Sequence, residues 1–272
     1  MTFDMSHGFA FDHCKNGHDT HQTKVVDFTL DISPKLKIEN MKMKIYDWSA
    51  YSDETFSRYT QYCNGQDIIS YKIDKEHLWE PYETAIIMDI LSEKDEPGTF
   101  YDLGAHIGWY STIGLKMGRH TISVDSDWEN IKMVEDNAKL NGVEAHVHKE
   151  IINIDTLGEP REVPVHLLKV DIEGEEQHAF RQFERSFWSK TVKYALFEIS
   201  PVFNDSYPKL CADIMDLGYD CYQIPTPGFH VQEFEDAPLA TLKKYCKLER
   251  GTIEDYIKTL HQENMIFIRQ DA

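Results

Sequence analysis

The fold of this chain is decided by residues 99–125, which read TFYDLGAHIGWYSTIGLKMGRHTISVD. The pattern predicts a strand, a turn with glycines at 104 and 108, a helix, and a second strand that ends in Asp125. Glycines in such a turn let a ligand approach the backbone without meeting a Cβ, and the helix that follows offers free backbone N–H groups. Asp125 lies 23 residues after Asp102, close to where a βαβ nucleotide site places its ribose-binding acid. This stretch therefore predicts a site for a ligand that contains ribose.

Strand and helix patterns alternate from residue 99 to residue 224, and a last apolar run, 265–268, lies near the C-terminal end. Such alternation predicts an α/β fold with a doubly wound, mostly parallel sheet that helices cover on both faces. A helical pattern over 75–94 precedes the first of these strands. We therefore expect residues 75–272 to form the ligand-binding domain.

Residues 1–74 differ in pattern and are expected to form an accessory segment rich in β-structure. Apolar and polar residues alternate over 24–32 and 35–46, which predicts two strands. A further strand is predicted over 67–73. The role of this segment is not evident from its residues.

Composition and charge limit the class of partner. The formal net charge of −19 at pH 7 argues against nucleic acid, whose phosphates require clustered cations, and against an anionic membrane surface. No run approaches the roughly 20 apolar residues of a membrane span. The five cysteines form no CxxC pair, and residues 1–10 lack the basic start and apolar core of a signal peptide. We expect a soluble, cytoplasmic protein with a small-molecule or glycan partner, and homo-oligomerisation stays open.

Acidic residues follow four of the predicted strands. Ligands of doubly wound sheets bind at the carboxyl ends of the strands. Chance could place one or two acids there, but four are hard to explain as solvated surface. The four acids at these ends are Asp102, Asp125, Asp171 and Glu198.

The glycine turn reads D-x-G-x-x-x-G rather than the G-x-G-x-x-G of dinucleotide sites. A carboxylate at Asp102 would repel a pyrophosphate but attract an ammonium group. S-adenosylmethionine has a ribose for Asp125, an amino-acid tail with an ammonium for Asp102, and no phosphate. The spacing favours this cofactor over NAD, although a glycine turn alone is weak evidence.

Four segments resemble the FkbM-type S-adenosylmethionine-dependent methyltransferases, within the class I methyltransferase fold. The segments are FYDLGAHIGWYST (100–112), ISVDSDWENIKMVEDNAKLNG (122–142), VHLLKVDIEGEEQHAF (165–180) and YALFEIS (194–200). They lie in order within residues 75–225, and LLKVDIEGEE is far more specific than the glycine turn.

The resemblance implies a seven-stranded sheet whose last strand, 265–268, is antiparallel. It places Asp102, Gly104 and Gly108 at the methionine end of the cofactor and Asp125 on the ribose. It also places Glu150 and Ile151 along the adenine and lets Glu83 reach the cofactor from the preceding helix. At position 106 the family more often has asparagine where this chain has histidine. The candidate cofactor-binding residues are Glu83, Asp102, Gly104, Ala105, His106, Gly108, Asp125, Ser126, Glu150, Ile151 and Asp171.

Methyl transfer to a hydroxyl benefits from a base near the methyl group. Asp171, Glu173 and Glu198 end the two central strands beside the expected methyl position, and they are the catalytic candidates. Asp171 with Glu198 could instead hold a divalent cation that lowers the pKa of the hydroxyl, although two carboxylates are too few to predict a metal. Glu173 could alternatively cap the next helix.

Enzymes of this resemblance methylate oxygen, often on sugars or polyketide-like natural products. Aromatic and polar residues mix in 201–207 and 224–229, which suits a sugar ring, a dimer contact or local core. We expect an O-methyltransferase acting on a sugar, glycan or similar small polyol. One alternative is an NAD-linked oxidoreductase or epimerase, although Lys193 and Tyr194 are adjacent rather than spaced as a catalytic pair. The other alternative is a non-catalytic binding module on the same fold.

Overall fold

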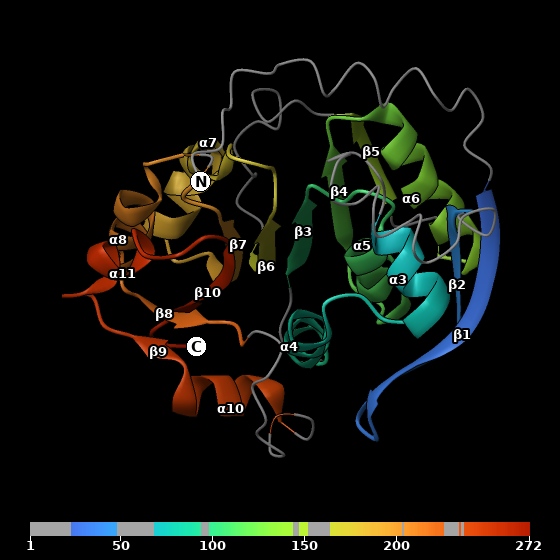
Figure 1. Cartoon of the computed structure of the whole chain (residues 1–272), viewed down its shortest axis with the longest axis horizontal. Coiled ribbons are helices and arrows are strands. Elements are labelled where there is room, and N and C mark those ends of the chain that lie inside the picture. Colours follow the sequence, from blue (N-terminus) through green and yellow to red (C-terminus); the bar gives the residue numbers. More distant parts are fainter. Residues whose placement is uncertain are drawn as a thin grey trace, which may run out of the picture.

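The computed structural model describes residues 23–47, 68–93, 98–143, 147–151, 164–202, 204–225, 234 and 237–272. An eight-stranded sheet runs through the molecule in the order β5-β4-β3-β6-β7-β10-β8-β9 (Figure 1). Its strands are β3 (Thr99–Leu103), β4 (Thr121–Asp125), β5 (Val147–Ile151), β6 (Val165–Val170), β7 (Val192–Ile199), β8 (Tyr219–Gln223), β9 (Lys247–Leu248) and β10 (Glu263–Arg269).

Strands β5, β4, β3, β6 and β7 pair in parallel, whereas β10 is antiparallel to both of its neighbours, β7 and β8. The predicted doubly wound, mostly parallel sheet with an antiparallel last strand is therefore confirmed. The structure adds β9, a two-residue strand paired to the outer edge of β8. Such a short strand leaves no pattern in the sequence.

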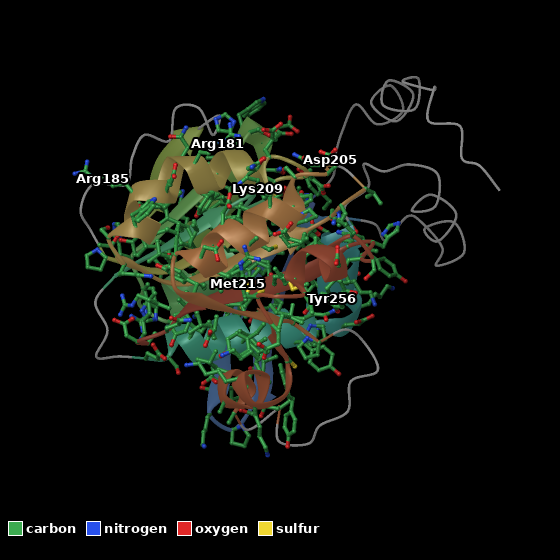
Figure 2. The ribbon with its side chains drawn as sticks, turned by 90° about the vertical axis from the view of Figure 1, so that its left-hand side faces the viewer. Arg181, Arg185, Asp205, Lys209, Met215 and Tyr256 are labelled. Carbon is green, nitrogen blue, oxygen red and sulfur yellow. The ribbon has the colours of Figure 1, made fainter. Side chains whose placement is uncertain are left out.

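Helices cover both faces of this sheet. The first face carries α4 (Pro81–Leu91), α5 (Trp109–Lys116), α6 (Trp128–Leu140) and α10 (Pro238–Tyr245). The second carries α7 (Glu176–Trp188), α8 (Tyr207–Asp216) and α11 (Ile253–Ile257). Figure 2 looks onto the second face, where Arg181 of α7 and Lys209 of α8 point outward. A hydrophobic core lies between the sheet and the helices on each face. Alternate side chains of β7 pack into these two cores, Tyr194 into the first and Ala195 into the second, as expected of a strand buried on both faces.

An N-terminal hairpin packs beside α6. Strands β1 (Thr23–Ser33) and β2 (Leu36–Tyr46) form a separate antiparallel sheet, which confirms the two strands predicted there. Asn137 of α6 accepts from the backbone N–H of Lys44 and donates to its carbonyl. One turn later, Asn141 makes the same pair of contacts with Lys42. Two side-chain amides thus bind backbone N–H and C=O groups on the edge of β2, where a neighbouring strand would otherwise bind them.

One predicted element next to this hairpin is wrong, and another is shorter than predicted. Residues 68–76 form a helix, α3 (Ile68–Glu76), in place of the strand predicted over 67–73. Its isoleucines suggested a strand, but Ser70 and Ile73 face inward at helical spacing. The helix predicted over 75–94 begins only at Pro81, because Glu80 has a left-handed backbone and proline favours the first helical position.

The predictions on residues 1–22 and 48–67 lie outside the described residues. Among the helices that the structure describes, none combines the length and the apolar character needed to cross a membrane.

Gly104 offers a test of the turn between β3 and α5. Its φ is +82°, and a Cβ there would lie 1.7 Å from the carbonyl oxygen of Asp171. Gly118 is a matched control, because its φ is +78° and a Cβ there would have no atom within 4 Å. A left-handed alanine costs about 1–2 kcal/mol at either site, and the clash at Gly104 adds about 1–3 kcal/mol. Urea unfolding should show a clearly larger loss for Gly104→Ala than for Gly118→Ala, and equal losses would contradict the close approach.

Candidate functional site

A cavity of about 400 Å³ opens at the carboxyl ends of β3, β4 and β6. It lies where doubly wound sheets bind their ligands. Seven of the predicted site residues line it together, namely Gly104, Ala105, His106, Asp125, Ser126, Asp171 and Glu173. We call this space the first cavity.

The other predicted residues lie around it in different ways. Asp102 is completely buried behind the turn and does not line the first cavity. Gly108 precedes α5, and a Cβ there would lie 3.0 Å from the Val134 side chain, so its small size serves the packing of α6. Glu150 and Ile151 belong to β5, which pairs with the end of β4. The structure describes this strand but not its side chains.

Asp125 organises the rim of the first cavity through its carboxylate. The oxygen Oδ2 accepts from the backbone N–H of His106 at 2.8 Å. The oxygen Oδ1 accepts from the backbone of Asp127 at 2.9 Å and from the side chain of Asn130 at 3.1 Å. A carboxylate offers about four acceptor sites, so these three contacts leave room for a donor on a bound ligand.

Lys169 lines the first cavity near the carboxyl end of β6, and its side chain is 2% exposed. Its ammonium is 2.9 Å from Asp171 Oδ2 and 3.9 Å from Glu83 Oε1, and it lies 4.8 Å from the centre of the Tyr110 ring. Burial alone would lower the pKa of Lys169, but the negative charges of Asp171, Glu83 and Asp102 raise it above its usual value. Lys169 is therefore a charged lysine inside the protein.

The acids around Lys169 outnumber it. Burial raises the pKa of Asp102 and of Glu80, and raises the pKa of Glu83 well above its ordinary value. Asp102 Oδ2 accepts from the Ser111 hydroxyl at 2.5 Å, but its Oδ1 has no hydrogen-bond partner. The sequence interpretation missed Lys169 and Glu80, although a lysine inside the apolar strand VHLLKV is a detectable signal.

Three predicted catalytic acids come together beyond Lys169. Asp171, Glu173 and Glu198 each place one carboxylate oxygen within 4.8 Å of the others. Burial, the charge of Asp171 and that of Glu173 raise the pKa of Glu198 to about 8, although Gln262 donates to its Oε1. Such a cluster could hold a metal ion, but Lys169 already supplies a cation to Asp171, and we assign no metal here.

Helix α7 begins without a side-chain cap, so Glu173 does not take the capping role considered for it, and the loop before α7 is held instead by Glu176. Its carboxylate accepts from the backbone N–H groups of Ile172 and Gly174 and from the hydroxyl of Tyr207. Glu176 thus fixes the loop between β6 and α7 from a completely buried position. Glu173 is exposed on that loop with a left-handed backbone, φ 55°, which leaves its carboxylate available to the site.

A second cavity of about 290 Å³ adjoins the first. Four glutamates line it, namely Glu80, Glu83, Glu198 and Glu263, together with Gln262 and Asn264. Asp171 lines the first cavity and Glu198 lines the second. Because these two carboxylates lie within 4.8 Å of each other, the two cavities are neighbours at this pair.

Comparison with known proteins gives structural likeness only. No protein-family model and no curated protein matches the sequence. The ribosomal protein L11 methylase from Lactobacillus delbrueckii subsp. bulgaricus is 13% identical over 71% of this chain and 80% of its own, with a TM-score of 0.44. The precorrin-6y C5,15-methyltransferase from Geobacter metallireducens GS-15 is 14% identical over 71% of this chain and 90% of its own, with a TM-score of 0.42. Cofactor-bound Rv0187 from MTB is 11% identical over 80% of this chain and 95% of its own, with a TM-score of 0.42.

Likeness at this level concerns the arrangement of strands and helices and carries no argument about activity. The doubly wound fold class itself rests on the strand order described above. Membership of the FkbM-type family stays a prediction.

Lys169 can be tested by removing its charge. Breaking a buried ion pair on one side costs about 3–5 kcal/mol, so Lys169→Met should lower the free energy of unfolding at pH 7 by about that amount. The loss should shrink at pH 5, because acidification protonates a larger share of the buried carboxyls whose pKa values are raised. Lys209→Met removes an exposed lysine of α8 and should cost under about 1 kcal/mol. A small loss at Lys169, unchanged between the two pH values, would contradict the account of this network.

Proposed function

We propose that this protein is an S-adenosylmethionine-dependent methyltransferase that transfers the methyl group to a hydroxyl of a sugar, glycan or similar small polyol. The observation that carries the proposal is the pair of adjoining cavities, with carboxylates grouped where they meet. A cofactor in the first cavity and an acceptor in the second would place their reacting atoms beside Asp171 and Glu198.

The residues of the first cavity suit this cofactor. Asp125 retains an acceptor site for a ribose hydroxyl, and Gly104 brings the backbone close without a Cβ. The unpartnered Oδ1 of Asp102 favours a positively charged amino-acid tail nearby, held through water because Asp102 does not line the cavity. The acids around the cavity, Asp125, Asp171, Glu173 and Glu175, favour a cation over a pyrophosphate.

The chemistry asks for positioning and for one proton acceptor. When bound, S-adenosylmethionine supplies a methyl group activated on a sulfonium; the hydroxyl oxygen of the acceptor takes this methyl, and the C–S electron pair stays on sulfur. Glu198 is our choice for the base that takes the hydroxyl proton. A base works best when its pKa lies near the working pH, and the pKa of Glu198 is raised to about 8. Gln262 holds one carboxylate oxygen of Glu198 by a hydrogen bond.

Neither alternative function gains support from the site. A Tyr/Lys pair for an NAD-linked oxidoreductase would be Lys193 and Tyr194, but both bind Glu93 at 2.9 Å at the start of β7. Glu198 lies near the opposite, carboxyl end of the same strand. A non-catalytic module would not be expected to keep three carboxylates grouped between two cavities.

Calorimetric titration tests the cofactor. S-adenosylhomocysteine should bind the full chain with micromolar or tighter affinity, and NAD should not bind measurably. Asp125→Asn should weaken this binding about 10- to 100-fold, because a hydrogen bond to a charged group is lost. The control Asp216→Asn alters an exposed carboxylate paired with Arg250 and should leave the affinity unchanged. Binding of NAD, or none of S-adenosylhomocysteine, would reject the proposal.

Methylation of a panel of glycans, followed by product mass, tests the base. With the acceptor found in this way, kcat/KM should rise with pH and level off above about 8, because only ionised Glu198 accepts the proton. Glu198→Gln should reduce kcat about 10²- to 10⁴-fold and remove this step of the pH profile. The neighbouring variant Glu173→Gln should keep the step and move it to lower pH, because the charge of Glu173 helps to raise the pKa of Glu198. An unchanged profile in Glu198→Gln would assign the proton to another group.

A further inference from the structure

The second cavity combines a small volume with many carboxylates. Its 290 Å³ correspond to about ten water molecules of the liquid, which suits one substituted sugar ring. Its four glutamates come from the start of α4, from β7 and from β10, so residues far apart in the sequence place the same charge around one space. The amides of Gln262 and Asn264 line the same space and can bind hydroxyls as donor or acceptor.

Glu83 has the most unusual environment of these four glutamates. Only 2% of the residue is exposed, and neither carboxylate oxygen has a hydrogen-bond partner. The hydroxyl of Tyr110, which lowers the pKa of Glu83, donates its proton to Glu80 Oε2 at 2.7 Å. Lys169 is 3.9 Å away and makes its shorter contact with Asp171. A buried carboxylate without partners costs free energy, so its position on the cavity wall points to a ligand that supplies donors.

The charge around Glu83 restricts what that ligand can be. Burial and the charge of neighbouring acids raise the pKa of Glu80, of Glu83 and of Glu198, and the positive charge of Lys169, which lowers each of these values, does not offset this rise. A phosphate or a carboxylate on the acceptor would meet four acids at close range and be repelled. A neutral hydroxyl could donate to Glu83 but would leave the excess negative charge in place. An ammonium group would donate to Glu83 and also balance that charge.

We propose, on the basis of the function proposed above, that the second cavity binds the acceptor through an ammonium group held by Glu83. The acceptor class is then an amine-bearing polyol, such as an amino sugar, whose hydroxyl lies toward Asp171 and Glu198. The amides of Gln262 and Asn264 bind further hydroxyls of the same ring. Phosphorylated and acidic sugars are excluded.

The test compares three sugar probes by calorimetry on the full chain saturated with S-adenosylhomocysteine: D-glucosamine, N-acetyl-D-glucosamine and D-glucose 6-phosphate. Saturation is checked first, so a failure to bind S-adenosylhomocysteine counts against the proposed function rather than against this inference. Glucosamine should bind about tenfold or more tightly than N-acetylglucosamine, because only it carries an ammonium for a charge-assisted hydrogen bond. Glucose 6-phosphate should not bind measurably.

Variants identify the residue responsible. Glu83→Gln, which keeps the shape of the side chain, should remove most of the preference for glucosamine and leave N-acetylglucosamine binding within about twofold. Glu263→Gln changes a half-buried wall residue and should reduce the same preference by a smaller factor. Glu184→Gln removes one charge from the exposed side of α7 and should change nothing.

Three results would overturn the proposal. The first is equal or weaker binding of glucosamine than of N-acetylglucosamine, including no binding of glucosamine at all. The second is a Glu83→Gln variant that lowers the affinity for glucosamine and for N-acetylglucosamine by the same factor. The third is a Glu83→Gln variant that loses affinity for S-adenosylhomocysteine and keeps the sugar preference, which would place Glu83 with the cofactor.

Discussion

The site depends on one buried cation, Lys169, placed among more acids than it can neutralise. It lies in a strand that is apolar on both sides, and it contacts Asp171 beside the first cavity and Glu83 beside the second. A lysine in such a position stays charged only because carboxylates surround it. The same contacts hold two carboxylates at the boundary between the cavities. The remaining negative charge is what makes both cavities suited to cationic ligands.

The sheet brings these groups together from distant parts of the chain. Strands β3, β4, β6 and β7 each have an acid within one residue of their carboxyl end, and their parallel pairing places those ends along one edge. The antiparallel β10 then adds Glu263 from the opposite direction, which closes the second cavity. Gly104 lets the turn after β3 pass against the backbone of Asp171, and Glu176 fixes the loop after β6 from below. The fold thus sets the spacing of the acids, and the loops set their orientation.

Much of this could be predicted from the sequence, because it depends on local patterns. Alternating strands and helices, glycines at a sharp turn and acids at strand ends predicted the sheet, and together with the family resemblance they predicted seven residues of the first cavity. The second cavity could not be predicted in this way, since Glu80, Glu198 and Glu263 meet only through strand order and helix packing. Helix α3 could not be predicted either, because its isoleucines favour a strand and its helical form depends on packing against β2. Glu176 and Glu173 are three residues apart, and only the folded loop shows that Glu176 is the one that binds the backbone N–H groups of the loop.

A crystal structure of the full chain with S-adenosylhomocysteine would test the central claim most directly. The account predicts the ligand in the first cavity, with its ribose hydroxyls on Asp125 and its sulfur facing the boundary formed by Asp171 and Glu198. A ligand bound elsewhere would contradict the account, as would a ribose that makes no contact with Asp125 or a sulfur that faces away from the second cavity.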